Sequence, residues 1–481
     1  MTRAEETGAG ETGRPIPPTT TGRAAVLTAM TLGLTLSMFN STIVNVTVPD
    51  IGPAFHASSS QLQWISSLYT LCYAALLLPG GAVGSRLGRR TAFLTGIACF
   101  ALGCLLCALA PTLPVLLVGR VVQAVGAAVM LPQTLTILVF EYAEPAARAR
   151  AVGIWAGGAS LGLSAGPVLG GIIVEVSTWR FGFGLSMLLA FVTWGLGWSA
   201  IPAERHGPPA RTPRVDLAGA ALSAVSLAAL VYALIESSAR GWGSPLILAS
   251  LAVFALVLTT FLARQHRLAA TGGTPLMPLR LWRSGSFVAA NVAALGYFIT
   301  FFAVLYFYSL DLQDVRGHSA LVSGLAFLPM TLVMAALGPV AGRLVASYGA
   351  LRVLVLGLAV AALGSLLLAL VPDRTGLLDL DWRLAVVGAG AGLISSPAST
   401  AAVGGIPPAD SGTASAVYNT IRQLGSTLGI AAVGVIVGAT DAPGFSHGLD
   451  RAMGVLAALL AAVGVLCLLI ARRTGSAAAG Q

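Results

Sequence analysis

Residues 161–171 read LGLSAGPVLGG and lie inside an apolar stretch that extends from residue 151 to residue 174. A helix that crosses a bilayer needs about 20 mostly apolar residues, so this stretch is long enough to do so. Its small residues recur about four positions apart, so that one helical face is smooth and a second membrane helix can approach it closely. Pro167 removes a backbone donor beside that face and permits a bend. The motif consists of Gly162, Gly166, Pro167, Gly170 and Gly171. We predict that this helix is a pivot between moving parts; ordinary tight packing is the alternative.

The rest of the chain has the same apolar character. Apolar residues make up 56% of the 481 residues, charged residues 9%, and the mean hydropathy is +0.86. A soluble domain carries roughly 25% charged residues. Fourteen apolar stretches separated by short polar loops run from residue 25 to residue 470. The sequence therefore predicts an all-α polytopic membrane protein with 14 transmembrane helices.

The basic residues exclude one energy source for transport and indicate the orientation of the chain in the membrane. All 27 are arginine, and a Walker A phosphate loop needs a lysine, so an ATP-driven pump within this chain is excluded. If the N-terminus is cytoplasmic, 19 arginines fall on the cytoplasmic side, six outside and two within the membrane. This asymmetry follows the positive-inside rule and indicates membrane insertion rather than nucleic-acid binding. We expect a multi-pass protein of the bacterial inner membrane with both termini cytoplasmic.

Two loops rich in proline and arginine, residues 202–215 and 264–285, flank one pair of apolar stretches. We therefore predict a disordered cytoplasmic tail (1–23), a six-helix bundle (24–201), an inserted helix pair with its loops (202–285), a second six-helix bundle (286–471) and a cytoplasmic tail (472–481). A short motif supports a duplication because it recurs at the same place in each half. Its two copies are Gly81, Val83, Arg86 and Leu87, and Gly338, Val340, Arg343 and Leu344.

Several motifs together resemble the major facilitator superfamily, in particular its fourteen-helix drug:proton antiporter group, over about residues 25–471. The glycine motif is the most specific of them. The others are the loop of Gly81, Val83, Arg86, Gly88, Arg89 and Arg90, the fourth-span set of Arg120, Gln123, Gly126 and Ala127, and the thirteenth-span set of Arg422, Gln423, Leu424, Gly425 and Gly429. The resemblance implies alternating access between two bundles and proton-driven export of a small hydrophobic compound such as an antibiotic.

The sequence departs from that family at two places. Ser85 occupies the position of an acidic residue in the arginine loop, so a carboxylate that holds the two halves together would be Glu141 or Glu144, or be missing. If it is missing, the arginines are membrane anchors only. Asn40 stands near the position where related exporters carry an aspartate in span one. That span therefore presents polarity without a carboxylate that could carry a proton.

Polar residues inside the apolar stretches predict the cargo and coupling path. An arginine at the bilayer centre costs roughly 2.5 kcal/mol or more, so it normally faces a cavity and has a partner. The predicted path consists of Asn40, Asn45, Arg120, Gln123, Asp311, Asn419 and Arg422. Asp311 is the deepest carboxylate; it pairs with Arg422 or is an exposed group at a helix end. Two buried arginines predict a neutral or anionic cargo.

The expected partners are therefore a small-molecule cargo, protons and the lipid bilayer, with no nucleic acid and no obligate protein partner. We expect no cofactor, no metal and no disulfide, because the five cysteines all fall in apolar stretches. A gradient-driven importer or an exporter of an endogenous metabolite remains an alternative. An enzyme is disfavoured because the five histidines are scattered over separate loops. A receptor would need a sizeable soluble output domain.

Overall fold

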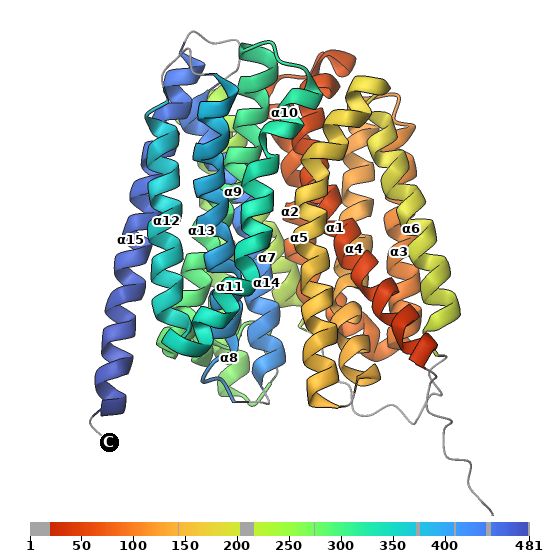
Figure 1. Ribbon diagram of the computed structural model, residues 1–481, viewed down its shortest axis with the longest axis vertical. Coiled ribbons are helices and arrows are strands. Elements are labelled where there is room, and N and C mark those ends of the chain that lie inside the picture. The colour runs from red at the N-terminus through yellow and green to blue at the C-terminus, as the bar shows by residue number, and fades with distance from the viewer. Residues whose placement is uncertain are drawn as a thin grey trace, which may run out of the picture.

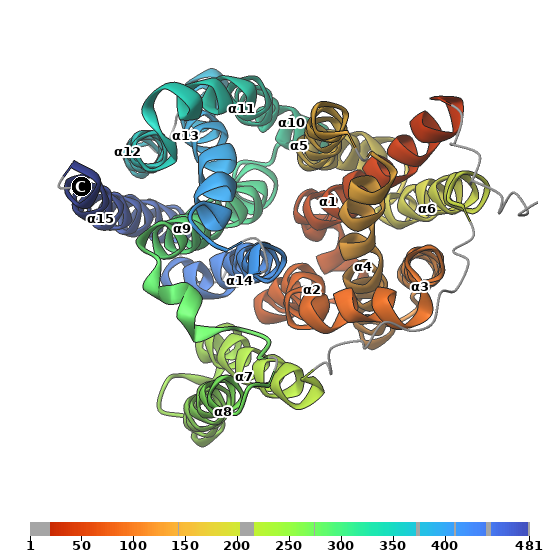
Figure 2. The ribbon, with the colours of Figure 1, turned by 90° about the horizontal axis from the view of Figure 1, so that it is seen from below.

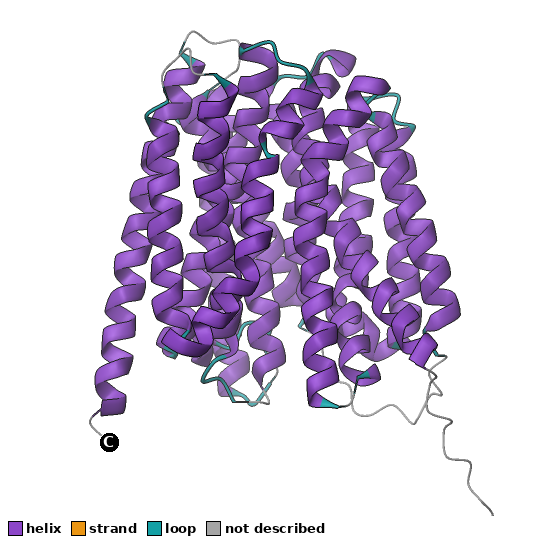
Figure 3. Cartoon of the chain, in the orientation of Figure 1, coloured by secondary structure: helices purple, strands orange, loops and turns teal. Residues whose placement is uncertain are grey.

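The computed structural model describes residues 20–142, 144–202, 216–273, 275–371, 376–407, 410–438 and 444–479. Within these ranges the regular structure is helical and no strand occurs (Figure 3). The first six helices are α1 (Thr20–Phe55), α2 (Ser59–Leu87), α3 (Arg89–Ala108), α4 (Leu113–Glu141), α5 (Pro145–Val176) and α6 (Arg180–Ala200). The next elements are α7 (Leu217–Arg240), α8 (Pro245–Ala270) and the short 3-10 helix η1 (Leu279–Arg283). The remaining elements are α9 (Gly285–Leu310), η2 (Asp311–Val315), α10 (Ala320–Ala326), α11 (Leu328–Tyr348), α12 (Ala350–Ala369), α13 (Leu377–Val403), α14 (Ser411–Val437) and α15 (Phe445–Ala479).

Fourteen membrane crossings account for these helices. Thirteen segments among the described residues are long and apolar enough to cross a bilayer. One of them, Ala320–Tyr348, comprises α10 and α11, which are separated at Phe327 just before Pro329. The fourteenth crossing is α2, a 29-residue helix that packs between α4 and α14. The predicted all-α fold with fourteen spans is therefore confirmed.

The helices form two groups that lie side by side. Seen from below, α1–α6 lie on one side and α9–α15 on the other, while α7 and α8 lie outside the junction of α2 and α14 (Figure 2). In the most apolar part of Gly285–Val315, 78% of the residues are buried, against 11% in Pro245–Ala270. Helix α9 is thus central to the second group, whereas α8 presents most of its surface to lipid.

The start of α1 and the end of α15 lie at the same end of the molecule, the lower end in Figure 1. Helix α1 already begins at Thr20, before the predicted end of the tail at residue 23, and α15 continues to Ala479, where a tail was predicted from residue 472. Alanine is the strongest helix former, and Ala477, Ala478 and Ala479 extend the last helix. The predictions for residues 1–19, 203–215 and 480–481 lie outside the described residues.

The described hydrogen bonds between the two groups lie in the upper half of the molecule as drawn in Figure 1. They join the hydroxyls of Thr70 and Thr427 (2.9 Å), Gln313 Nε2 and the Val46 carbonyl (3.1 Å), and Ser164 Oγ and the Thr331 carbonyl (3.5 Å). Three glycines in the lower half, Gly153 and Gly157 of α5 and Gly338 of α11, border open space. A Cβ atom added at any of them would meet no atom within 4 Å. The groups are therefore tightly joined above and more loosely packed below.

Candidate functional site

Three of the predicted path residues form one hydrogen-bonded network in the first group. Helix α4 presents Arg120 and Gln123 on one face because they are three residues apart. The Arg120 side chain is completely buried; its Nε donates to the Ile65 carbonyl (3.1 Å) and its Nη1 to Gln123 Oε1 (3.0 Å). Gln123 Nε2 in turn donates to Asn40 Oδ1 on α1 (3.3 Å). The sequence predicts all three as path residues, but it does not predict the contact between Gln123 and Asn40.

Residues that the sequence did not single out for this network complete its wall. Tyr69 places its ring centroid 4.7 Å from the Arg120 guanidinium, and its hydroxyl is 2.8 Å from the hydroxyl of Ser37. The Cys104 thiol, which we expected only as a small buried apolar group, accepts from Gln123 Nε2 at 3.1 Å. These contacts join α1, α2, α3 and α4, so spacing along one helix could not reveal them.

No carboxylate belongs to the network within the part of the chain that the structure describes. The titratable groups that act electrostatically on Arg120 are Cys107, Tyr69, Cys104 and Cys72. Thiols and phenols with ordinary pKa values are neutral at pH 7. The guanidinium is therefore a positive charge held by neutral acceptors.

Arg422 lies in different surroundings, in α14 of the second group. It is only half-buried, and its Nη1 donates to Asn419 Oδ1 (3.2 Å). Its guanidinium is 4.6 Å from the ring centroid of Phe298 and 5.8 Å from that of Tyr418. It also acts electrostatically on Tyr73 of α2 in the first group. Arg422 and Asn419 are thus together, close to the junction of the two groups.

The predicted pairing of Asp311 with Arg422 is wrong. Asp311 is 1% exposed, and its Oδ2 is 2.6 Å from Nε of Arg316. The π-helical turn η2 starts at Asp311 and brings Arg316, five residues later, back to the carboxylate. The alternative, an exposed group at a helix end, is wrong as well because the carboxylate is buried. Asn45 is also buried, but its amide donates to the Ser41 carbonyl (3.4 Å) rather than to the Arg120 network.

The glycine motif of α5 serves two contacts rather than one. A Cβ at Gly162, Gly166 or Gly170 would meet α1, at Thr35, Thr42 and Ile43 respectively. Gly171 instead faces the Ala320 backbone of α10, and Gly324 of α10 faces the Pro167 carbonyl. We expected a single smooth face at the pivot. The structure shows two: α5 presents one face to its own group and another to the second group.

The arginine loop between α2 and α3 contacts its own group. Arg89 lies 3.5 Å from the ring centroid of Phe140, and Arg90 donates to the Trp198 carbonyl (2.7 Å). Gly88 has φ 85°, a conformation that favours glycine. Arg86 is exposed, and Gly81 faces Pro132 of α4.

The described ion pair of Glu141 does not join the two halves. Glu141 pairs with Arg23 of α1 (3.8 Å), and Glu144 accepts from the Ala147 amide (3.0 Å). Both contacts lie within the first group, because Glu141 ends α4 beside the start of α1 and Glu144 directly precedes α5.

A polar cluster anchors the inserted pair. Asp216 caps α7 by accepting from the Gly219 amide (2.8 Å), and it also binds Arg264 Nη2 (2.7 Å) and Gln265 Nε2 (2.9 Å) of α8. Burial raises the pKa of Asp216, but these hydrogen bonds outweigh burial and hold the pKa below its usual value. At the other end of α7, Trp64 of α2 donates to Glu236 (3.2 Å).

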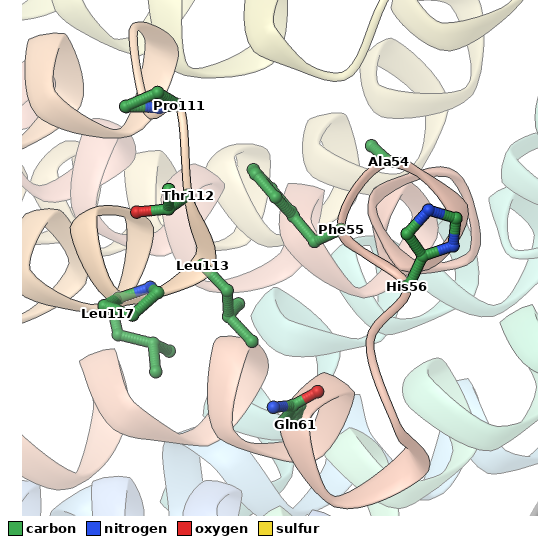
Figure 4. A pocket seen from close by; sticks show the side chains of 9 residues that line it. Ala54, Phe55, His56, Gln61, Pro111, Thr112, Leu113 and Leu117 are labelled. Carbon is green, nitrogen blue, oxygen red and sulfur yellow. The ribbon is translucent and has the colours of Figure 1, made fainter.

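A hollow of about 540 Å³ opens at the upper end of the first group (Figure 4). Phe55 and His56 at the end of α1, Gln61 of α2, and Leu113 and Leu117 of α4 surround it. Among the described residues, no three of His, Cys, Asp and Glu are grouped so as to hold a metal ion.

Residues 30–430 match the family model described as Major Facilitator Superfamily. The chain belongs to the Major Facilitator Superfamily. It is a multi-pass membrane transporter rather than an enzyme, and members of this superfamily act on small-molecule substrates. The expected resemblance is thereby confirmed.

Three curated relatives are similar in sequence over 89–94% of this chain. The chain is 32% identical to the methylenomycin A resistance protein of Bacillus subtilis (strain 168), over 94% of this chain and 96% of that protein. It is 32% identical to the cephamycin export protein CmcT of Amycolatopsis lactamdurans, over 94% and 93%. It is also 32% identical to the multidrug resistance protein Stp of Mycobacterium tuberculosis (strain CDC 1551 / Oshkosh), over 89% and 78%.

Solved structures share the fold at lower identity. A crystal structure of the peptide transporter POT matches with a TM-score of 0.70 and 17% identity, over 94% of this chain and 95% of that one. A bacterial homologue of the lysosomal transporter Spinster, inward-facing and unoccupied, matches with a TM-score of 0.65 and 17% identity, over 95% and 98%.

Proposed function

We propose that this protein exports a small hydrophobic compound, such as an antibiotic, across the bacterial inner membrane by proton antiport. Relatives at 32% identity carry names that refer to antibiotic resistance or export, and they align over nearly the whole chain. The absence of lysine from the sequence excludes a Walker A loop, so an ion gradient supplies the energy. A unit charge that crosses the membrane gains about 2.3 kcal/mol per 100 mV.

The lower end in Figure 1 is assigned to the cytoplasm, which puts both termini there. The described arginines at lower helix ends are Arg23, Arg86, Arg89, Arg90, Arg148, Arg150, Arg264, Arg267, Arg280, Arg283, Arg343, Arg352 and Arg472. Those at upper helix ends are Arg180, Arg240, Arg316, Arg383 and Arg451. This imbalance supports the orientation, because cytoplasmic loops carry an excess of basic residues.

Cargo is assigned to the junction beside Arg422. The observation that carries this assignment is a half-buried arginine with no described carboxylate partner, flanked by the aromatic rings of Phe298 and Tyr418. Ligand sites combine apolar and aromatic walls with a few polar groups that fix orientation. A positive charge at this place favours neutral or anionic cargo over lipophilic cations.

The transport cycle alternates which end of the junction is closed. Hydrogen bonds join the groups in the upper half, whereas glycines of α5 and α11 leave open space below, which suits cargo entry from the cytoplasmic side. Helix α5 is the pivot because it packs on α1 through Gly166 and on α10 through Gly171. The buried carboxylate of Asp311 is the candidate proton carrier, and Arg316 would bind it when it is ionised.

Drug accumulation in a host that lacks its own efflux pumps tests the proposal. Cells that express the protein should accumulate less of at least one compound in a panel of methylenomycin A, puromycin, tetracenomycin C and a cephamycin, and an uncoupler should abolish the difference. Strong export of the ethidium cation that is unchanged by Arg120→Ala and by Arg422→Ala would contradict the assigned cargo class. Uptake in place of export would contradict the assigned direction.

A further inference from the structure

The first group contains a buried positive charge that no described carboxylate balances. The side chain of Arg120 is completely buried, and it cannot lose its proton, since the guanidinium stays charged. Buried charges in proteins are normally paired. The groups around Arg120 are a peptide carbonyl, an amide, an aromatic ring and thiols, all neutral at pH 7. The site therefore lacks one negative charge.

Two hydrogen-bond donors of the same network lack partners among the described residues. They are Nη2 of Arg120 and Nδ2 of Asn40, and both are buried. The amide of Gln123 joins the two side chains, because its oxygen accepts from Arg120 and its nitrogen donates to Asn40. Both unsatisfied groups are donors. A buried donor without an acceptor is destabilising, so the missing component is an acceptor that carries negative charge.

The hollow at the upper end of the first group opens about one helical turn from this network (Figure 4). Gln61 and Leu117 line the hollow, and each precedes a member of the network, Ile65 or Arg120, by about one helical turn, roughly 5 Å. The guanidinium of Arg180 lies 5.8 Å from the ring centroid of Phe55, which also lines the hollow. A positive charge near the entrance attracts anions.

We propose that a small monovalent anion binds between Arg120 and Asn40, and that it accepts hydrogen bonds from the two unpartnered donors. Its source is either a halide ion from solution or the carboxylate of a cargo molecule, since both offer the same charge to the same donors. The anion site rests on the geometry around Arg120, and only the cargo carboxylate as its source rests on the proposed export function. An anion effect without export, or export without an anion effect, would separate the two.

Thermal unfolding of the purified full-length protein in detergent tests the proposal. At constant ionic strength, replacing sodium isethionate by sodium chloride should raise the unfolding temperature by about 2 °C or more, because an anion that binds only the folded state stabilises it. Sodium benzoate serves as the carboxylate probe. An increase with chloride indicates a halide site, and an increase with benzoate alone indicates a cargo carboxylate. No increase with either anion would overturn the proposal.

Asn40→Asp is the decisive variant because it supplies a carboxylate within the network itself. This variant should unfold at the same temperature in chloride, benzoate and isethionate. Asn45→Asp is the matched control: Asn45 is a buried asparagine on the same helix whose described hydrogen bond goes to Ser41. The control should keep the wild-type response. An anion response that persists in Asn40→Asp, or one that disappears equally in both variants, would overturn the assignment to Arg120.

Discussion

The two arginines inside the membrane differ in burial and in their place relative to the junction of the two groups. Arg120 is fully buried within the first group and donates to Ile65 and Gln123. Arg422 is half-buried near the junction, and it stacks on aromatic rings with one described hydrogen bond, to Asn419. The comparison teaches that an arginine in an apolar span has at least two uses. Arg120 joins helices of the first group from inside. Arg422 offers a positive charge to cargo that binds between the two groups.

Arg120→Ala should cause the larger loss. Truncation removes one of the largest completely buried side chains, together with its hydrogen bonds to the Ile65 carbonyl and Gln123 Oε1. The cavity and the lost hydrogen bonds should together lower the free energy of unfolding by at least about 2 kcal/mol. Export should be lost with it. Thermal unfolding and drug accumulation measured on the same preparation check both effects, and a variant as stable as wild type would remove the distinction between the two arginines.

Arg422→Ala should reduce export with little change in stability. Partly exposed contacts between arginine and aromatic rings contribute about 0.5–1 kcal/mol each, so the unfolding temperature should shift only slightly. Loss of one charged contact to cargo of about 1.4 kcal/mol corresponds to a tenfold weaker apparent affinity. The concentration dependence of transport in proteoliposomes measures this effect. Unchanged transport would mean that cargo does not meet Arg422.

A substitution in α5 sharpens the comparison by disturbing the junction near its upper end and leaving both arginines in place. Gly171→Val would collide with the Ala320 backbone of α10, so it should weaken the upper closure and lower the transport rate severalfold. Gly195→Val in α6 is the control, because a Cβ there meets no atom within 4 Å and α6 packs on helices of its own group. Spin labels on α5 and α10 report the separation at the upper end. An equal effect of both substitutions would contradict the assigned pivot.

The smallest effect should come from the inserted pair, away from both arginines. The pKa of Asp216 is lower in the folded protein than in the unfolded chain, where it is about 3.9. Its stabilising contribution is therefore complete above about pH 4 and decreases as the pH falls through the folded-state pKa. Asp216→Asn should lower the unfolding temperature at pH 7 by about 1–3 °C and should remove this part of the acid sensitivity. Export by cells should stay unchanged.

Sequence patterns predicted the number of spans and the residues of the Arg120 network better than they predicted which side chains contact each other. Fourteen apolar stretches are visible in composition, and Arg120 with Gln123 follows from helical spacing. The contact of Gln123 with Asn40 joins α4 to α1, and no local pattern encodes it. The pairing of Asp311 was missed because it depends on a π-helical turn, and hydropathy does not distinguish such a turn from a regular helix.

The most direct test of the account is drug uptake by inside-out membrane vesicles that contain the protein. In such vesicles the cytoplasmic side faces the medium, so an exporter carries cargo into the lumen. We predict that acidifying the lumen by respiration drives uptake of at least one compound of the panel, that an uncoupler stops it, and that Arg422→Ala greatly weakens it. Uptake that continues after the uncoupler, or a compound that leaves the lumen when respiration starts, would contradict the account.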